Sequence, residues 1–382
     1  MYLLNTFLGI LAGIITGLIP ALHINQVAQI LSSLPLNESF LPFFIAIAIT
    51  HSFLDFIPTI LLGIPNEYTI ISSLPGSYYL AKGKAFYAIK LTLYGSFFAV
   101  IYTIFLYPLY SPILSLSLNF LKLFAKYFLI FVLTILLLTE HHKKYALFAI
   151  SSSFLLGIIS LKFLNIQNPF APLIIGFFPL SQCIISSLAE NPKFPKQKIS
   201  QDKFPKDSII YAFFGFVAGL ISSIFAILSP AQMAFLISFL FSSNPSTFLI
   251  TLGAINTSYL LISFLSSYMG FAPHSLIAIK AYENFSFSSQ QLPLIFSVAL
   301  LVASLAYIIG FFLSKIIIKK ISSINYANFS KLMLLFLILY IYFTSGFLGL
   351  LLAFTATTIG MLCILSGVKK SHCMCFLLAT FV

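Results

Sequence analysis

The chain contains no tryptophan, and all of its basic residues are lysine. Charged residues make up only 7% of the 382 residues, whereas hydrophobic residues make up 60%, with a mean hydropathy of +1.07. Soluble domains of this size carry far more charge, so the composition excludes a soluble globular protein. We therefore predict an all-α polytopic membrane protein, in which tyrosine and phenylalanine supply the aromatic residues at the membrane interfaces.

The formal net charge of +12 comes from lysines in short loops, which the positive-inside rule explains without a nucleic-acid partner. The chain has no phosphate-binding loop, dinucleotide fingerprint or nucleophilic triad. Cys373 and Cys375 lack the second pair of ligands that a zinc site needs, so they are interpreted as packing residues. We predict no metal, no cofactor and no enzyme activity; a membrane-embedded hydrolase that uses Asp55 and His51 is the one enzymatic alternative left open.

An apolar run from Leu3 to Leu34 is interrupted by Pro20 and then by three polar residues, His23, Asn25 and Gln26. As one helix the run would be about 48 Å long at ~1.5 Å per residue, against a hydrocarbon core of ~30 Å. A proline inside a helix removes a hydrogen bond and clashes with the preceding turn, so the run should break near Pro20. We expect two half-helices that meet at a polar elbow, which survives at membrane depth only inside protein or against a wet cavity.

The elbow recurs, because the segment Gly9–Leu31 aligns without a gap with Gly215–Ile237. In the second copy Ser229 suits the N-cap of a helix, Pro230 its first position, and Gln232 completes a capping box. Two half-helix N-termini would then face the membrane interior with free N–H groups and a partial positive charge. Interrupted apolar segments at corresponding places in two halves are typical of a transporter binding site.

The end of each half repeats as well, since Ala146–Gly157 resembles Gly349–Gly360. We therefore predict two inverted-topology repeats, each of which opens with a re-entrant or broken helix hairpin. The N-terminal transmembrane repeat covers residues 1–188 and the C-terminal one residues 209–382. Residues 189–208 form a polar, proline-rich and basic linker between them.

The lysines predict how the chain is oriented in the membrane. If each elbow enters and leaves on one side, five further crossings after the first hairpin place the two halves in opposite orientations. On this path one side of the membrane receives the lysines of five segments: Lys82/Lys84, Lys143/Lys144, the linker, Lys315/Lys319/Lys320 and Lys369/Lys370. By the positive-inside rule this side is cytoplasmic. We predict a multi-pass protein of the plasma membrane with a cytoplasmic linker and an external N-terminus.

Asp55 is the most specific candidate for a functional residue. A carboxylate within a membrane span costs about 2.5 kcal/mol or more unless it is paired, hydrated or protonated. His51 lies one helical turn before Asp55, and with His23 it is the other titratable group expected at this depth. These residues could carry a coupling proton or Na⁺, and a structural hydrogen bond to a neighbouring helix is the alternative. Six neutral residues near the elbows could bind a carboxylate or Na⁺, or simply hold helices together: Asn25, Gln26, Ser229, Gln232, Asn256 and Thr257. In the repeat alignment Asn256 and Thr257 correspond to Thr50 and His51.

Several motifs resemble the archaeal branch of the tripartite tricarboxylate transporter large-subunit (TctA) family. They are GLIPALHINQVA, ITHSFLDFIP, GIPNEYTIISSLPG, INTSYLLISF and the terminal GVKKSHCMCFLL, and the run from Thr50 to Gly76 is the most specific of them. The resemblance implies a secondary-transporter fold of two inverted repeats, driven by an ion gradient. Bacterial relatives work with a small membrane subunit and a periplasmic binding protein. Archaeal members often stand alone, so those partners are not assumed here.

The elbows depart from the family pattern, which usually reads Pro-Gly where this chain has Pro20-Ala21 and Ala226-Ile227. Glycine admits a close approach of the backbone to a ligand, so the substrate could instead lie against side chains. The leading hypothesis is a permease for a small organic anion of the carboxylate class, coupled to H⁺ or Na⁺. A translocase for a lipid-linked phosphate and a membrane scaffold without transport activity are the alternatives. Homo-oligomer formation is left open.

Overall fold

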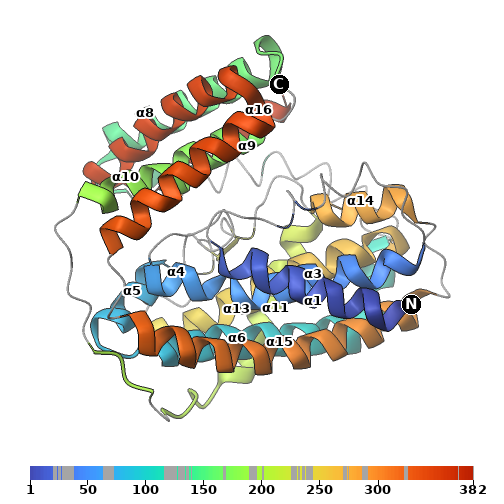
Figure 1. Ribbon diagram of the computed structural model, residues 1–382. Coiled ribbons are helices and arrows are strands. Elements are labelled where there is room, and N and C mark those ends of the chain that lie inside the picture. The colour runs from blue at the N-terminus through green and yellow to red at the C-terminus, as the bar shows by residue number, and fades with distance from the viewer. Residues whose placement is uncertain are drawn as a thin grey trace. The chain divides into compact units, whose positions relative to one another are not determined.

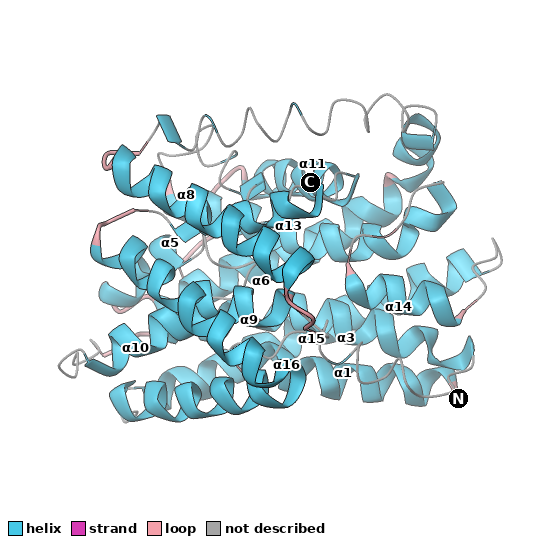
Figure 2. Cartoon of the chain, turned by 90° about the horizontal axis from the view of Figure 1, so that it is seen from above, coloured by secondary structure: helices cyan, strands magenta, loops and turns pink. Residues whose placement is uncertain are grey.

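In the computed structural model, the described residues form helices joined by turns, with no strand among them (Figure 2). The structure describes residues 1–19, 38–62, 73–115, 140–166, 169–188, 196–199, 202–224, 244–269, 275–285, 291–321, 326–368 and 370–381, with a few single positions between them. Six helical stretches within these ranges are long and apolar enough to cross a membrane: Glu38–Leu61, Ala85–Phe105, Lys143–Phe163, Pro245–Leu265, Leu292–Lys320 and Ser330–Leu365. The prediction of an all-α multi-pass membrane protein is confirmed, and the inverted topology of the two halves stays a prediction.

The chain forms two compact units, and each unit combines segments from both halves of the sequence. Unit 1 comprises Met1–Gly63, Ile71–Phe124 and Phe194–Ser322. Unit 2 comprises Ile64–Ile70, Ala125–Lys193 and Ser323–Val382. The predicted boundaries at 1–188, 189–208 and 209–382 describe repeats along the sequence, and that division stays a prediction.

Unit 1 is built around two central helices, α3 (Leu41–Leu54) and α13 (Pro245–Leu265). The spans that contain them have 94% of their most apolar stretch buried, which is the environment that a helix apolar on all sides requires. Helix α1 packs along α3, and α11 packs along α13 (Figure 1). The other helices of this unit are α4 (Phe56–Leu62), α5 (Ser73–Ala81), α6 (Ala85–Phe105), α14 (Leu276–Asn284) and α15 (Leu292–Ile321), while α1 covers Tyr2–Leu18 and α11 covers Ser208–Ile224.

Glycines bring α1 against α3 in the same way as they bring α11 against α13. A Cβ atom added to Gly9 would lie 2.5 Å from the carbonyl oxygen of Phe43, and one added to Gly215 would lie 2.5 Å from that of Thr251. Small residues allow membrane helices to approach this closely, so that backbone packs against backbone. The first helix pair of each half therefore shares one mode of packing, as expected of a duplicated unit.

The contacts also correct the register of the repeat alignment. Gly13 faces the Thr50 side chain, whereas its counterpart Gly219 faces the Ser258 side chain. In space, Thr50 therefore corresponds to Ser258, two positions beyond Asn256, with which the ungapped alignment pairs it. The alignment is wrong here because the connection between the paired helices is two residues longer in the second half than in the first.

Helix α5 is a regular helix in a part of the sequence that is rich in proline and glycine. Pro75 lies in the first turn of this helix, where a missing N–H costs no intrahelical hydrogen bond. The chain turns out of the helix at Gly83, whose φ of 73° lies in the left-handed region that glycine adopts without strain. The turn at Gly83 therefore joins the C-terminal end of α5 to the start of α6.

Unit 2 contains a long, interrupted helix, α16 (Tyr326–Leu365). Gly346 has φ 65° and ψ −166° and divides α16 into two helical parts. The unit also contains α8 (Lys143–Ile158), α9 (Phe170–Ile175), α10 (Ser181–Leu188), the π-helical segments η3 (Ile159–Phe163) and η4 (Gly176–Leu180), and the C-terminal 3₁₀ helix η7 (Lys370–Phe381). Helix α16 packs against α8, α9 and α10, and η7 packs against α8.

Candidate functional site

Asp55 lies at the break between α3 and α4, inside a continuous membrane-length stretch. Pro58 follows three residues later and has no N–H for the carbonyl group of Leu54, so the regular helix cannot pass through this point unchanged. The hydroxyl of Thr59 donates to the backbone oxygen of Asp55 over 2.9 Å, which satisfies a carbonyl group at the break. The Asp55 residue is only 3% exposed, so its carboxyl group is held in the interior of unit 1.

His51 lies one turn earlier on α3 and connects Asp55 to α1. Its Nδ1 atom lies 3.2 Å from the hydroxyl oxygen of Thr16. With its hydrogen on Nδ1, the imidazole donates to the Thr16 oxygen, and the Thr16 hydroxyl turns its own hydrogen to the carbonyl oxygen of Gly13 over 3.3 Å. With its hydrogen on Nε2, the imidazole accepts at Nδ1 from the Thr16 hydroxyl, so the contact fits both tautomers.

The tautomer of His51 decides what this residue presents to Asp55. In a neutral imidazole with hydrogen on Nδ1, the Nε2 atom is an acceptor, and it lies 3.9 Å from Oδ2 of Asp55, which is longer than a hydrogen bond. In that tautomer two acceptors face each other, and a proton on Nε2 or on the carboxyl group, or a cation near both, removes their repulsion. With hydrogen on Nε2, the imidazole instead directs a donor toward the carboxyl group.

Asn256 brings α13 to the same carboxyl group. Its Nδ2 atom donates to Oδ2 of Asp55 over 3.0 Å, and the Asn256 residue is 1% exposed. Only the amide nitrogen can donate to a carboxylate, so the amide oxygen must point elsewhere. Among the described residues, Asn256 Oδ1 has no hydrogen-bond partner. A buried amide oxygen of this kind is a ready ligand for a cation or for a donor group of a solute.

Ser52, one turn before Asp55 on α3, also meets Thr257, which directly follows Asn256 on α13. Their hydroxyl oxygens are 3.0 Å apart, and both residues are fully buried. A hydroxyl can donate and accept at once, so this contact joins the two central helices without introducing charge. Asp55–Asn256 and Ser52–Thr257 form two adjacent polar bridges between the halves of the sequence.

The structure therefore brings together four of the predicted site residues: His51, Asp55, Asn256 and Thr257. The other five, which belong to the two elbows, lie outside the residues that the structure describes: His23, Asn25, Gln26, Ser229 and Gln232. Their predicted roles, and the predicted capping box, stay predictions. Within the described ranges no group of three or more potential ligand residues could hold a metal ion.

Sequence reasoning missed Thr16, which contacts Nδ1 of His51. The sequence does contain a pattern that marks the face of α1 on which Thr16 lies. Gly9, Gly13 and Gly17 recur every four residues, as on a helix face that packs against another helix. A Cβ atom on Gly17 would lie 3.2 Å from the carbonyl oxygen of His51, so this face is the one that meets the site. A hydroxyl that follows Gly13 by three residues on the same face was therefore a candidate.

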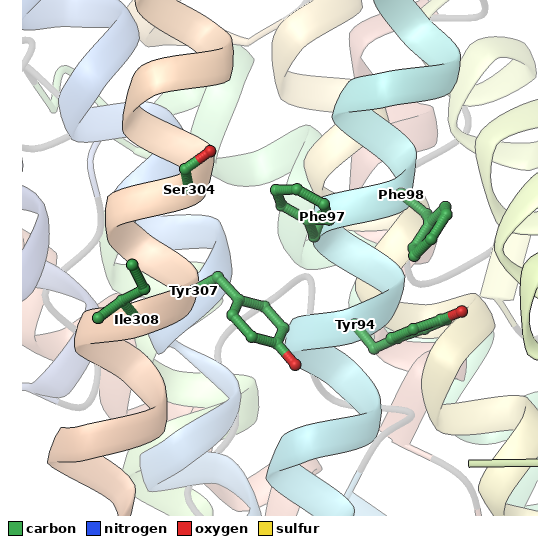
Figure 3. A pocket seen from close by; sticks show the side chains of 6 residues that line it. All are labelled: Tyr94, Phe97, Phe98, Ser304, Tyr307 and Ile308. Carbon is green, nitrogen blue, oxygen red and sulfur yellow. The ribbon is translucent and has the colours of Figure 1, made fainter.

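An open pocket of about 350 Å³ lies on unit 1 (Figure 3). Its lining comes from α6 and α15 and is mostly aromatic: Tyr94, Phe97, Phe98, Ser304, Tyr307 and Ile308. This lining contains no charged side chain and none of the four site residues that the structure describes. Its composition suits contact with apolar molecules rather than recognition of an anion.

The linker binds to the start of α6, where several lysines gather. Lys84 Nζ lies 3.1 Å from Oδ2 of Asp202. The Gln197 side chain accepts from the Ala85 N–H over 3.1 Å and donates to the Leu80 carbonyl group over 2.9 Å. Lys315, near the end of α15, lies at the same place, with its ammonium group over the rings of Phe86 and Phe311 at the distances 6.0 and 4.1 Å. Lysines from three segments that are distant in sequence thus share one end of unit 1.

Comparison with known proteins adds two findings. A family model described as "Tripartite tricarboxylate transporter TctA family" matches residues 3–208, which include His51 and Asp55. A curated relative, an uncharacterized protein of Methanocaldococcus jannaschii, is 28% identical over 384 residues, and the alignment covers 97% of this chain and 96% of that protein. No solved structure matches the chain.

Proposed function

The chain belongs to the tripartite tricarboxylate transporter TctA family, and from this premise we propose that it is a secondary transporter for a small organic anion of the carboxylate class, coupled to H⁺ or Na⁺. The resemblance seen in the sequence motifs is confirmed by this match. Members of the family are transporters rather than enzymes, and the match does not favour a translocase for lipid-linked phosphate.

The observation that supports coupling is the buried contact between Asp55, His51 and Asn256. Oδ2 of Asp55 lies 3.9 Å from Nε2 of His51 and 3.0 Å from Nδ2 of Asn256. When Nδ1 of His51 carries the hydrogen, Nε2 and the Asp55 carboxylate face each other as acceptors, and a positive charge between or on them stabilises the pair. A proton meets that need directly, and Na⁺ could meet it with the Asn256 amide oxygen as a further ligand. Asp55 is the coupling residue in this proposal.

The anion is proposed to bind near the two elbows. Half-helix N-termini offer N–H groups and a partial positive charge to a carboxylate, and neutral donors nearby complete its coordination. The residues assigned to this role are His23, Asn25, Gln26, Ser229 and Gln232, with Thr257 beside Asn256 on α13. Binding the anion next to a loaded cation site lowers the electrostatic cost of both, which is a physical basis for cotransport.

We place the protein in the plasma membrane with the linker on the cytoplasmic side. The shared position of Lys84, Lys315 and the linker at one end of unit 1 supports this orientation, because lysine-rich ends of membrane proteins face the cytoplasm. No small subunit or binding protein is assigned as a partner.

The test is uptake by proteoliposomes that contain only the purified full-length chain. Labelled mono-, di- and tricarboxylates are supplied under an imposed proton gradient, an imposed Na⁺ gradient, or neither. We expect at least one acid to accumulate under one ion gradient and to equilibrate without accumulation when that gradient is absent. Equal uptake by empty liposomes, for every acid and gradient, would overturn the proposal that this chain alone is a gradient-driven carrier.

A further inference from the structure

Two cysteines in unit 2 lie in direct contact. The sulfur atoms of Cys363, near the end of α16, and Cys373, in η7, are 3.5 Å apart. Both residues are fully buried, and neither takes part in a disulfide. The sequence interpretation treated the cysteines of this region as packing residues, and it did not place these two together.

The surrounding backbone holds the two sulfur atoms in place. The chain reverses direction after α16 through Gly367, whose φ of 71° is one that glycine adopts without strain. The N–H of Val368 donates to the carbonyl oxygen of Cys363 over 2.9 Å and closes this turn. On the other side, the hydroxyl of Ser153 on α8 donates to the carbonyl oxygen of Ile150 over 3.1 Å, and its oxygen lies 3.4 Å from the carbonyl oxygen of His372. The contact between the sulfurs is therefore a consequence of a fixed chain reversal.

Several titratable side chains lie buried in the same part of unit 2 as the two thiols. The Lys370 ammonium donates to Oε1 of Gln182 over 3.1 Å and to the carbonyl oxygen of Phe178 over 3.3 Å. Burial lowers the pKa of Lys370 to about 8, and the nearby thiols act against this shift by favouring its charged form. Glu140 Oε2 and His372 Nε2 form a second buried pair, 3.6 Å apart.

The two sulfur atoms are within hydrogen-bond distance, and either thiol can be the donor. The sulfur that accepts the hydrogen bond gains thiolate character, and a thiolate is the species that attacks a disulfide. The bond to Cys363, together with burial, raises the pKa of the Cys373 thiol well above its usual value, which favours Cys363 as the first nucleophile.

We propose that Cys363 and Cys373 are a redox-active dithiol, which small disulfides oxidise to an intramolecular disulfide between α16 and η7. In the first step, the Cys363 thiolate attacks one sulfur of the small disulfide; a mixed disulfide forms and one small thiol leaves with a proton. In the second step, Cys373 attacks the sulfur of Cys363, the mixed bond breaks, and the second small thiol leaves with the proton of Cys373. Two protein thiols are oxidised and one small disulfide is reduced.

The reaction depends on the contact between the two sulfurs and on brief opening of η7, which exposes them. Once the mixed disulfide has formed, Cys373 is already adjacent, so the second step is intramolecular and fast. The product fastens the C-terminal segment to the end of α16. The proposal concerns unit 2 and is independent of the transport function proposed above.

Two double variants of the full-length protein in detergent micelles test the site. The variant Cys183→Ser/Cys375→Ser keeps only the proposed pair, and Cys363→Ser/Cys373→Ser keeps only the other two cysteines, which are also buried. Each protein is equilibrated with glutathione disulfide, denatured, alkylated with N-ethylmaleimide and measured by intact mass. We expect the first variant to lose both alkylation sites without retaining glutathione, and dithiothreitol to restore both. The second variant should keep two free thiols or carry glutathione on them.

Peptide mapping of the oxidised wild-type chain provides a measurement that does not depend on either variant folding. It should contain a disulfide-linked peptide pair that includes Cys363 and Cys373, formed at least tenfold faster than any other linkage. Two alkylated thiols in the pair-only variant after full equilibration, stable glutathione adducts on it, or linkage between separate chains would each overturn the proposal.

Discussion

The side-chain amide of Asn256, on α13, donates a hydrogen bond to the carboxyl oxygen Oδ2 of Asp55, on α3, over 3.0 Å. This bond connects the second half of the sequence to the buried acid at the break between α3 and α4. Because both residues are buried, a change in the charge of Asp55 changes the strength of its hydrogen bond to α13. The consequences can be tested at each residue around the bond.

Replacing Asp55 with Asn should abolish accumulation while the protein still assembles. Asparagine keeps the shape of the side chain and removes the charge that the coupling ion balances. We expect accumulation in proteoliposomes to fall to the level reached without an ion gradient, because the neutral amide can neither bind a coupling proton nor balance the charge of Na⁺. Exchange of labelled for unlabelled substrate should persist. The control Glu38→Gln removes an acid at the exposed start of the same span, and normal accumulation by Asp55→Asn would move the coupling site to His51 or His23.

Replacing Thr16 with Val should change how the hydrogen of the neutral His51 ring is distributed between Nδ1 and Nε2. We expect that in the wild-type protein Nδ1 carries the hydrogen and donates it to Thr16; without the Thr16 oxygen this acceptor is lost, so both neutral tautomers become populated. Solid-state ¹⁵N NMR of histidine-labelled protein measures this directly, and the wild-type His51 should show hydrogen on Nδ1. The control is Thr6→Val, which removes a buried hydroxyl from the same helix that bonds only the carbonyl group of Tyr2 over 2.9 Å. Unchanged His51 signals in Thr16→Val would contradict the assignment.

Exchanging the partners of the Asp55–Asn256 bond should rescue a defect that one change alone creates. Asn256→Asp places two carboxyl groups in contact inside the membrane, and the repulsion should lower the thermal midpoint in detergent by several degrees. The double variant Asp55→Asn/Asn256→Asp again contains one acid and one amide, so most of the midpoint should return. If the double variant is no more stable than Asn256→Asp, the two side chains do not interact as the structure indicates.

The contact between Ser52 and Thr257 should appear as a modest coupling energy. A double-mutant cycle of Ser52→Ala and Thr257→Ala, measured by unfolding in mixed micelles, should give about 0.6 kcal/mol, the average for polar contacts between membrane helices. The same cycle with Ser263→Ala in place of Thr257→Ala should give none, because the Ser263 hydroxyl bonds the carbonyl group of Tyr259 on its own helix. A coupling energy of zero in the first cycle would show that the Ser52 and Thr257 hydroxyls do not stabilise the protein by interacting with each other.

The orientation in the membrane can be read from two reporter fusions. A reporter inserted in Ala189–Ser208 should be cytoplasmic, and one inserted at Pro35–Asn37 should be external, because the lysines gather at the linker end of unit 1. Accessibility to a membrane-impermeant thiol reagent on single introduced cysteines gives the same information without a large insertion. Finding both positions on one side would contradict the inverted arrangement of the halves.

Composition and spacing were sufficient for the class of the protein, and they singled out four residues that the structure places near one another. The low charge and the long apolar runs predicted a multi-pass helical membrane protein, because a bilayer accepts only such segments. An acid in an apolar run is costly anywhere in the membrane, so Asp55 could be singled out without a structure. His51 followed from the helical spacing of four residues, and Asn256 and Thr257 followed from the repeat, although the alignment that suggested them was two residues out of register.

The sequence by itself thus determined that this is a helical, multi-pass membrane protein and that Asp55 is the acid expected within a membrane span. Which groups meet that acid was decided only by the tertiary structure. Helices α3 and α13 are apolar and buried on nearly all sides, so no amphipathic stripe indicates how each is rotated about its axis. Their rotation is set by glycine contacts with α1 and α11, in which a shift of two residues turns a side chain to the opposite face. That packing places Asn256 on Asp55 and Thr16 on His51, whereas in unit 2 the chain reversal at Gly367 brings Cys363 onto Cys373.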